Sequence, residues 1–252
     1  MQLNNPWFTF VRPNPDAKVR LFCFHYAGGR SIVFRRWQSM LPDAIQVFPV
    51  ELPGRGGRLR ENPFRSLGPL IEVLQNVLVP HLDRPFAFFG HSMGGLISFE
   101  LARALRRAGY LLPVHLFISA HRAPHLPNPD SSTYDLPDEK LIEKIRSIEG
   151  TPPEVLAHPE LLELILPILR ADFEICDTYA YTAAQPLDCP ITVFGGTDDR
   201  VVSPDLLPGW AEHTTRLFEL RTFPGNHFFI QEAERQVLEI IGERLVQTLR
   251  AG

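Results

Sequence analysis

Short, almost entirely apolar runs recur along the chain, with longer and partly polar stretches between them. Runs of this kind are typical of strands that a parallel sheet buries on both faces. Six segments are predicted as strands: Val19–His25, Ile45–Val50, Phe86–Gly90, Val114–Ala120, Ile191–Gly195 and Arg216–Phe223. A sheet of buried strands is therefore the expected core of the protein.

Helical patterns lie between several of these runs. In Leu67–Leu82 the apolar residues recur every three or four positions, which is the spacing of one buried helix face. Ser92–Ala108 and Ala233–Leu249 have the same spacing. Because strands and helices alternate, the pattern predicts an α/β fold with a mostly parallel, doubly wound sheet.

One segment, about residues 121–185, breaks the alternation. It has no convincing strand pattern, but Asp138–Ile148 and Pro159–Tyr181 have helical periodicity, and prolines interrupt the rest. Open α/β sheets bind ligands beyond the carboxyl ends of their strands. We therefore expect a single domain over residues 1–252, in which residues 121–185 form a helical lid insertion over that edge of the sheet.

Composition narrows the class of protein. A length of 252 residues fits one α/β domain, and a net charge of −4 disfavours a nucleic-acid-binding protein. The three cysteines form no C-x-x-C pair, which favours a reducing compartment. The N-terminus lacks the pattern of a signal peptide, and no apolar run is long enough to span a membrane. We expect a cytoplasmic protein that is monomeric and has no contact with membranes.

The clearest chemical motif is Gly90-His91-Ser92-Met93-Gly94, which fits G-x-S-x-G between a predicted strand and a predicted helix. This context is that of the nucleophile elbow of α/β hydrolases, where glycines permit a strained turn. The hydroxyl group then lies at a helix N-terminus, where the helix dipole favours negative charge. Ser92 is the predicted nucleophile; the alternative is a tight turn in which Ser92 only caps the helix.

A serine nucleophile needs a base, and the base needs an acid to orient it. In this fold the order along the chain is serine, acid, histidine, which selects His227 in the loop after the last predicted strand. The loop after Ile191–Gly195 offers Asp198 and Asp199. Spacing favours Asp199 as the acid, with Asp198 as the alternative.

An oxyanion hole requires two backbone N–H groups. One is predicted at Met93, the residue after the nucleophile. The other is predicted at Ala27, with Tyr26 as the alternative, because Gly28 and Gly29 allow the loop after the first strand to approach a ligand closely. The competing interpretation of this loop is a plain turn.

These residues specify acyl transfer to water through an acyl-enzyme, but they do not separate esters, thioesters and amides. A general carboxylesterase or acyl-CoA thioesterase would use the same triad. A non-catalytic binding protein on a hydrolase scaffold is a further alternative, which the intact triad disfavours. No histidine pair has a zinc-ligand spacing such as H-E-x-x-H, so no metal is expected. No other cofactor is expected either.

Further motifs are spread along the whole chain. They are Trp7, Leu21–Gly29, Phe34–Trp37, Pro49–Arg55, Gly90–Gly95, Ser119–His125, Leu166–Phe173, Gly195–Asp199 and Gly225–His227. Together and in this order, they make the chain resemble the type II thioesterases, stand-alone editing enzymes of polyketide and non-ribosomal peptide synthesis. That family commonly has proline before histidine or phenylalanine in the first loop, whereas this chain has His25-Tyr26.

The resemblance implies a substrate and a partner. The substrate is an acyl group held as a thioester on the phosphopantetheine arm of an acyl or peptidyl carrier protein, and the reaction removes aberrant or stalled groups. Such carriers are acidic, and residues 30–65 contain seven arginines against three acidic residues. One hypothesis is that some of these arginines contact the carrier; a solvated surface is the alternative. The candidates are Arg35, Arg36, Arg55, Arg58 and Arg60.

Overall fold

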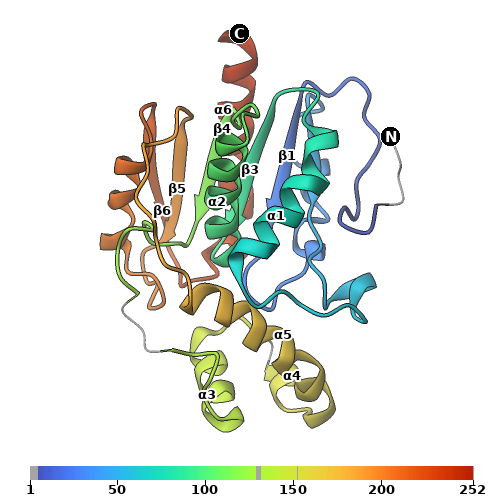
Figure 1. The fold of residues 1–252 in the computed structure, drawn as a ribbon, viewed down its shortest axis with the longest axis vertical. Helices are drawn as coiled ribbons and strands as arrows, with labels where there is room; N and C mark the ends of the chain where they lie inside the picture. The colour runs from blue at the N-terminus through green and yellow to red at the C-terminus, as the bar shows by residue number, and fades with distance from the viewer. Residues whose placement is uncertain (1–4, 129–131, 152, 252) are drawn as a thin grey trace.

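A parallel sheet forms the centre of the protein in a computed structural model that describes residues 5–128, 132–151 and 153–251 (Figure 1). In these residues the sheet has six strands in the order β2-β1-β3-β4-β5-β6, every neighbouring pair parallel. The strands are β1 (Val19–Phe24), β2 (Ile45–Pro49), β3 (Phe86–His91), β4 (His115–Ser119), β5 (Ile191–Gly196) and β6 (Phe218–Phe223). All six predicted strands are present, and the predicted fold class is confirmed.

Helices cover both faces of the sheet. They are α1 (Leu67–Leu78), α2 (Met93–Arg107) and α6 (Glu234–Ala251). In Figure 1, α1 and α2 lie in front of the sheet and α6 lies behind it. Successive residues of a strand point to opposite faces, so Phe22 and Phe88 join the apolar cluster with α1 and α2, while Leu21 and Phe89 join the cluster with α6. This two-sided burial explains why the inner strands are apolar at most positions, whereas the edge strand β6 has polar residues at its exposed positions, Arg221 and Thr222.

Two helices end about one turn earlier than the sequence predicts, whereas the other boundaries differ by at most two residues. The helix predicted over Leu67–Leu82 ends at Leu78 and continues as a 3-10 turn, Val79–His81, that has a proline at its start. Pro80 has no N–H to donate to the preceding turn, so it fits the start of a new turn better than the interior of an α-helix. The helix predicted over Pro159–Tyr181 ends at Asp177.

Three helices occupy the segment predicted as a lid. They are α3 (Asp138–Ile148), α4 (Pro153–Leu156) and α5 (Pro159–Asp177). Figure 1 shows them below the sheet, beyond the end at which β3 leads into α2. They have a small apolar cluster of their own, which includes Leu141, Ile145 and Leu169. The described residues between 121 and 185 contain no strand. That these helices act as a lid, within one domain of residues 1–252, stays a prediction.

The lengths and compositions of the helices decide whether one of them could span a membrane. None of those in the described part of the chain combines the length and the apolar character that crossing a bilayer requires.

Candidate active site

Ser92 lies in a strained turn between β3 and α2. Its backbone has φ 54° and ψ −118°, a conformation that non-glycine residues rarely adopt. A Cβ atom on Gly90 would lie 1.9 Å from the Gly94 carbonyl oxygen, and one on Gly94 would lie 2.1 Å from the Phe24 carbonyl oxygen. Glycine is therefore required at both ends of the turn. Ser92 N–H donates to the Ser119 carbonyl at 2.7 Å, which fixes the turn against β4.

The structure brings Ser92 and the predicted base and acid into one chain of hydrogen bonds. Ser92 Oγ lies 2.9 Å from His227 Nε2, and His227 Nδ1 lies 2.8 Å from Asp199 Oδ2. His227 and Asp199 are buried, while Ser92 is partly exposed. With a proton on Nδ1 that is donated to Asp199, Nε2 is free to accept the hydroxyl proton of Ser92. This arrangement is the one that a serine hydrolase needs.

The two candidate aspartates have different surroundings. Asp199 Oδ1 accepts the Val201 and Val202 N–H groups at 2.8 and 2.9 Å, so its other oxygen faces His227 in a fixed direction. Asp198 is exposed, and its Oδ2 lies 3.0 Å from Thr197 Oγ1. The geometry thus favours Asp199 as the acid, whereas Asp198 helps to shape the loop.

The loop after β1 packs directly on the start of α2. The Gly94 backbone lies so close to it that a Cβ there would also be 2.9 Å from the His25 carbonyl oxygen. Within the described residues, neither the Ala27 N–H nor the Met93 N–H donates a backbone or side-chain hydrogen bond, so both remain available to a ligand. The assignment of Ala27, rather than Tyr26, to the oxyanion hole stays a prediction.

The peptide that carries the Ala27 N–H is held from its other side. The Tyr26 carbonyl accepts the Gly29 N–H at 2.9 Å and lies 2.9 Å from His25 Nδ1. Because a peptide unit is planar and trans, fixing its carbonyl also fixes the direction of its N–H. Burial lowers the pKa of His25 to about 4, helped by the Arg55 charge. His25 is therefore neutral near pH 7, and its Nδ1–H can donate to the Tyr26 carbonyl.

Two further buried histidines near the site, His91 and His121, are also neutral near pH 7. His91 turns into the protein, with Nδ1 2.9 Å from Ser119 Oγ, and burial lowers its pKa well below the ordinary value. Burial lowers the pKa of His121 to about 3. No group of His, Cys, Asp and Glu side chains in the described ranges is arranged to hold a metal ion.

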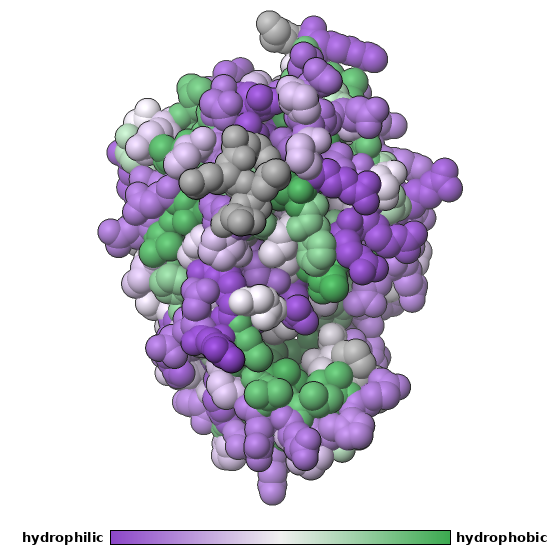
Figure 2. Space-filling view, turned by 90° about the vertical axis from the view of Figure 1, so that its right-hand side faces the viewer, coloured by the Kyte–Doolittle hydropathy of each residue, from purple (hydrophilic) through white to green (hydrophobic). Residues whose placement is uncertain are grey.

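A pocket of about 600 Å³ borders the site. Ala27 of the predicted oxyanion loop and Phe228, next to His227, both line it. Its wall is largely apolar, and α5 contributes Leu161, Leu164, Ile165, Ile168 and Leu169 to it. In Figure 2, green apolar side chains surround a hollow in the lower half of the molecule. The pocket therefore suits an apolar chain attached to the group that reacts at Ser92.

Sequence reasoning missed a buried ion pair beside this pocket. Arg55 and Asp172 have side-chain exposures of 3% and 1% and are joined by two hydrogen bonds of 2.7 and 2.8 Å. Both residues lie in motifs that carry the family resemblance, but the sequence alone predicts Arg55 only as a surface contact. One signal in the sequence points to a buried carboxylate: Asp172 lies on a face of the predicted helix whose other residues, such as Leu169 and Ile175, are apolar.

Comparison with known proteins supports a single family. Residues 19–245 match the family described as "Thioesterase domain". Gramicidin S biosynthesis protein GrsT of Aneurinibacillus migulanus is 43% identical over 241 residues, which cover 96% of this chain and 94% of that protein.

Solved structures agree with the sequence relatives. RedJ, a thioesterase from the prodiginine pathway of Streptomyces coelicolor, has a TM-score of 0.86 and 40% identity, covering 92% of this chain and 87% of that chain. The type II thioesterase BorB from the borrelidin biosynthetic cluster has a TM-score of 0.84 and 35% identity, covering 93% and 97%. The family inferred from the motifs is thus confirmed. The chain belongs to the thioesterase family, has an α/β-hydrolase fold, and is a hydrolase that acts on thioesters.

Proposed function

We propose that this protein is a type II thioesterase that removes aberrant or stalled acyl groups from the phosphopantetheine arm of acyl or peptidyl carrier proteins. The observation that carries the proposal is the Ser92–His227–Asp199 hydrogen-bond chain at the border of an apolar pocket. The names of the relatives support the pathway class, because GrsT belongs to gramicidin S biosynthesis and BorB is called a type II thioesterase.

The proposed reaction begins with attack of Ser92 Oγ on the thioester carbonyl carbon, while His227 Nε2 takes the hydroxyl proton. The carbonyl oxygen becomes an oxyanion that the Ala27 and Met93 N–H groups stabilise. When the tetrahedral intermediate collapses, the carbon–sulfur bond breaks and the leaving sulfur takes the proton from His227. Water, activated by His227, then attacks the acyl-enzyme, which releases the carboxylic acid and restores the Ser92 hydroxyl.

Every group in this scheme comes from the chain itself, so no cofactor is proposed; the phosphopantetheine arm belongs to the substrate. The apolar pocket wall on α5 suits the acyl chain, and the lid helices would cover it. We further propose that the enzyme acts as a monomer in the cytoplasm and has no nucleic-acid partner.

Intact-protein mass spectrometry of an acetyl-loaded carrier protein tests the proposal. The wild-type enzyme should remove the acetyl mass and leave the free phosphopantetheine thiol, whereas Ser92→Ala should not. The general carboxylesterase or acyl-CoA thioesterase is the competing function. Rapid cleavage of p-nitrophenyl esters or acyl-CoA, with no loss of acetyl from the carrier above background, would replace the proposal with that function.

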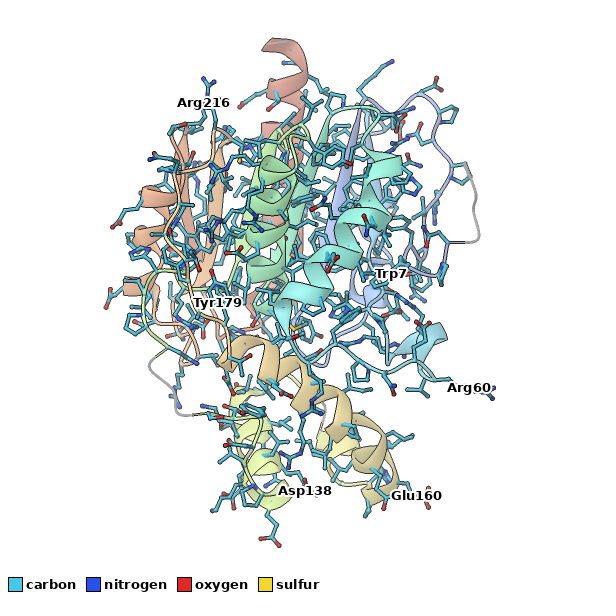
Figure 3. All side chains as sticks on the ribbon, viewed as in Figure 1. Trp7, Arg60, Asp138, Glu160, Tyr179 and Arg216 are labelled. Carbon is cyan, nitrogen blue, oxygen red and sulfur yellow. The ribbon has the colours of Figure 1, made fainter. Side chains whose placement is uncertain are left out.

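The structure corrects the hypothesis on the carrier-binding arginines. Arg55 is buried in its pair with Asp172, and Arg58 is buried against the Trp7 ring and paired with Glu61. Neither guanidinium is available to a partner. Arg35, Arg36 and Arg60 are exposed, and Arg60 projects away from the fold in Figure 3. Arg35 and Arg60 lie close in sequence to Val33 and Leu59, which line the pocket. They therefore remain the candidates for contact with the carrier protein.

Charge reversal should separate docking from a merely solvated surface. We expect Arg35→Glu with Arg60→Glu to lower kcat/KM on an acyl-carrier substrate by roughly tenfold at low salt, because electrostatic attraction mainly speeds association. The difference in kcat/KM between this double variant and the wild type should shrink as added salt screens the charges. The control is Arg107→Glu with Arg250→Glu, which also reverses two exposed arginines; they belong to the C-terminal ends of α2 and α6, which lie away from the lid helices in Figure 1. Equal kcat/KM values for the two double variants would rule out docking through this surface.

A further inference from the structure

A carboxylate of the lid helix α5 reaches the predicted oxyanion loop. Asp172 on α5 accepts the Gly28 N–H at 2.7 Å through Oδ2. The same side chain is held by Arg55, with Nη1 2.7 Å from Oδ2 and Nη2 2.8 Å from Oδ1. Arg55 Nη1 also lies 3.3 Å from the Gly29 carbonyl oxygen, to which it donates. The ion pair therefore contacts the backbone on the carboxyl side of Ala27.

The burial of this pair calls for an explanation beyond stability. Removing two charges from water is costly, and a buried ion pair often adds no net stability compared with apolar side chains. Asp172 is 1% exposed and does not line the pocket, so it contacts no ligand there. Its hydrogen bonds instead fix a bidentate guanidinium and one backbone amide, which suits a positioning role.

These contacts complete the immobilisation of Ala27. On its amino side, the Tyr26 carbonyl is held by His25 and by the Gly29 N–H. On its carboxyl side, the next amide, Gly28 N–H, is held by Asp172. With both neighbouring peptide planes fixed, the Ala27 N–H has one direction available. A preorganised donor of this kind needs no reorganisation when the oxyanion forms.

Helix α5 also packs tightly on the same loop. Gly28 has φ +73°, and a Cβ there would lie 2.4 Å from Leu169 Cδ2. Leu169 and Asp172 are three positions apart, so they lie on one face of α5. One side chain therefore covers Gly28 while the other binds its N–H. Both contacts exist only when α5 lies against the loop.

We propose that Asp172, held by Arg55, is a positioning residue for the oxyanion hole: it fixes the backbone of Gly28 so that the Ala27 N–H faces the reacting carbonyl. Catalysis then depends on the seating of α5 on the loop, so the lid segment contributes to the rate as well as to the acyl pocket. This inference rests on the proposed function, since it takes Ala27 as an oxyanion donor.

The test compares Asp172→Ala with Asp177→Ala on a carrier-free substrate, an octanoyl thioester of N-acetylcysteamine. Asp177 is a matched control because it also lies on α5 and also accepts backbone N–H groups, those of Thr133 and Tyr134, away from the oxyanion loop. Loss of one oxyanion donor costs about 100-fold to 1000-fold in kcat. For a misdirected donor we expect about 10-fold to 100-fold for Asp172→Ala, with KM nearly unchanged and little change for Asp177→Ala.

A second readout separates positioning from loss of structure. An alkyl trifluoromethyl ketone mimics the tetrahedral intermediate. Ser92 Oγ adds to its carbonyl carbon, His227 takes the serine proton, and the ketone oxygen becomes an oxyanion in the oxyanion hole. Its affinity should fall by the same factor as kcat/KM in Asp172→Ala. Binding of the matching thioether, which has no carbonyl oxygen, should not change. A general loosening of the pocket would weaken both ligands equally.

Milder variants keep the test decisive if Asp172→Ala does not fold. Asp172→Asn retains an oxygen for the Gly28 N–H, and Arg55→Lys retains the charge but not the bidentate contact. Each should lose less activity than the alanine variant, with matching losses in kcat/KM and ketone affinity. Unchanged ketone affinity in variants that have lost activity, or an equal loss in Asp177→Ala, would overturn the inference. A wild-type enzyme that hydrolyses no thioester would instead overturn the proposed function.

Discussion

Ser92→Ala is expected to lower kcat for thioester hydrolysis by at least about 10,000-fold, which is the effect of removing the nucleophile from a serine hydrolase triad. The fold should remain intact, because the substitution removes only an oxygen that hydrogen-bonds His227. The backbone bonds of the turn, from Ser92 N–H to the Ser119 carbonyl and from Gly95 N–H to the Ser92 carbonyl, do not involve the side chain. Alanine meets the same strain at this φ as serine does.

The control for this variant is Ser98→Ala, which removes a buried hydroxyl from the same helix. Ser98 Oγ donates to the Gly94 carbonyl at 2.8 Å and makes no contact with His227. Activity of this variant should stay within a few-fold of wild type, and its melting temperature should report any loss of packing. Labelling by a fluorophosphonate should persist in Ser98→Ala and disappear in Ser92→Ala. Residual labelling and turnover in Ser92→Ala would require a different nucleophile.

The fold and the nucleophile turn could be predicted because their signals are local. The inner strands are apolar at most positions since both of their faces are covered, and the glycines of Gly90–Gly94 are required by contacts as short as 1.9 Å. The Ser92–His227 pair is distant in sequence, but the order of triad residues in this fold links the two positions. The signal that separates Asp198 from Asp199 is weaker, because both follow the same strand. What distinguishes them is the three-dimensional surroundings: Asp199 is buried, accepts the Val201 and Val202 N–H groups and reaches His227.

The pairing of Arg55 with Asp172 could not be predicted. Arg55 and Asp172 are 117 positions apart, and nothing in either local sequence indicates that they meet. An arginine in a glycine-rich loop has the same local sequence pattern whether its side chain is solvated or buried. The cluster of arginines therefore predicts one exposed basic surface, although only some of these arginines are exposed. Arg55 and Arg58 are buried although they lie in an arginine-rich segment, because burial depends on packing between distant segments and not on charge along the chain.

Asp199→Asn should lower kcat by roughly 1000-fold to 10,000-fold, although it changes a single atom and its attached hydrogens. Asp199 Oδ1 accepts two backbone N–H groups, from Val201 and Val202, so the amide oxygen of asparagine must take that position. The amide NH₂ then faces His227 Nδ1, which has to accept a hydrogen bond instead of donating one. The proton moves to Nε2, and Nε2 can no longer accept the Ser92 proton.

Asp198→Asn is the matched control, since it makes the same chemical change at the neighbouring residue. Asp198 is exposed, and its side chain contacts Thr197 and the Gly225 N–H but not His227. Its kcat should remain within about twofold of wild type, as for most exposed substitutions away from the reacting groups. Steady-state kinetics on one thioester substrate suffice for the comparison, with melting temperatures to show that both variants fold. A large loss of kcat in Asp198→Asn with near-normal turnover in Asp199→Asn would reverse the assignment. Asp198 would then have to reach His227 through a rearranged loop, because among the described side chains only Asp199 lies within hydrogen-bonding distance of His227 Nδ1.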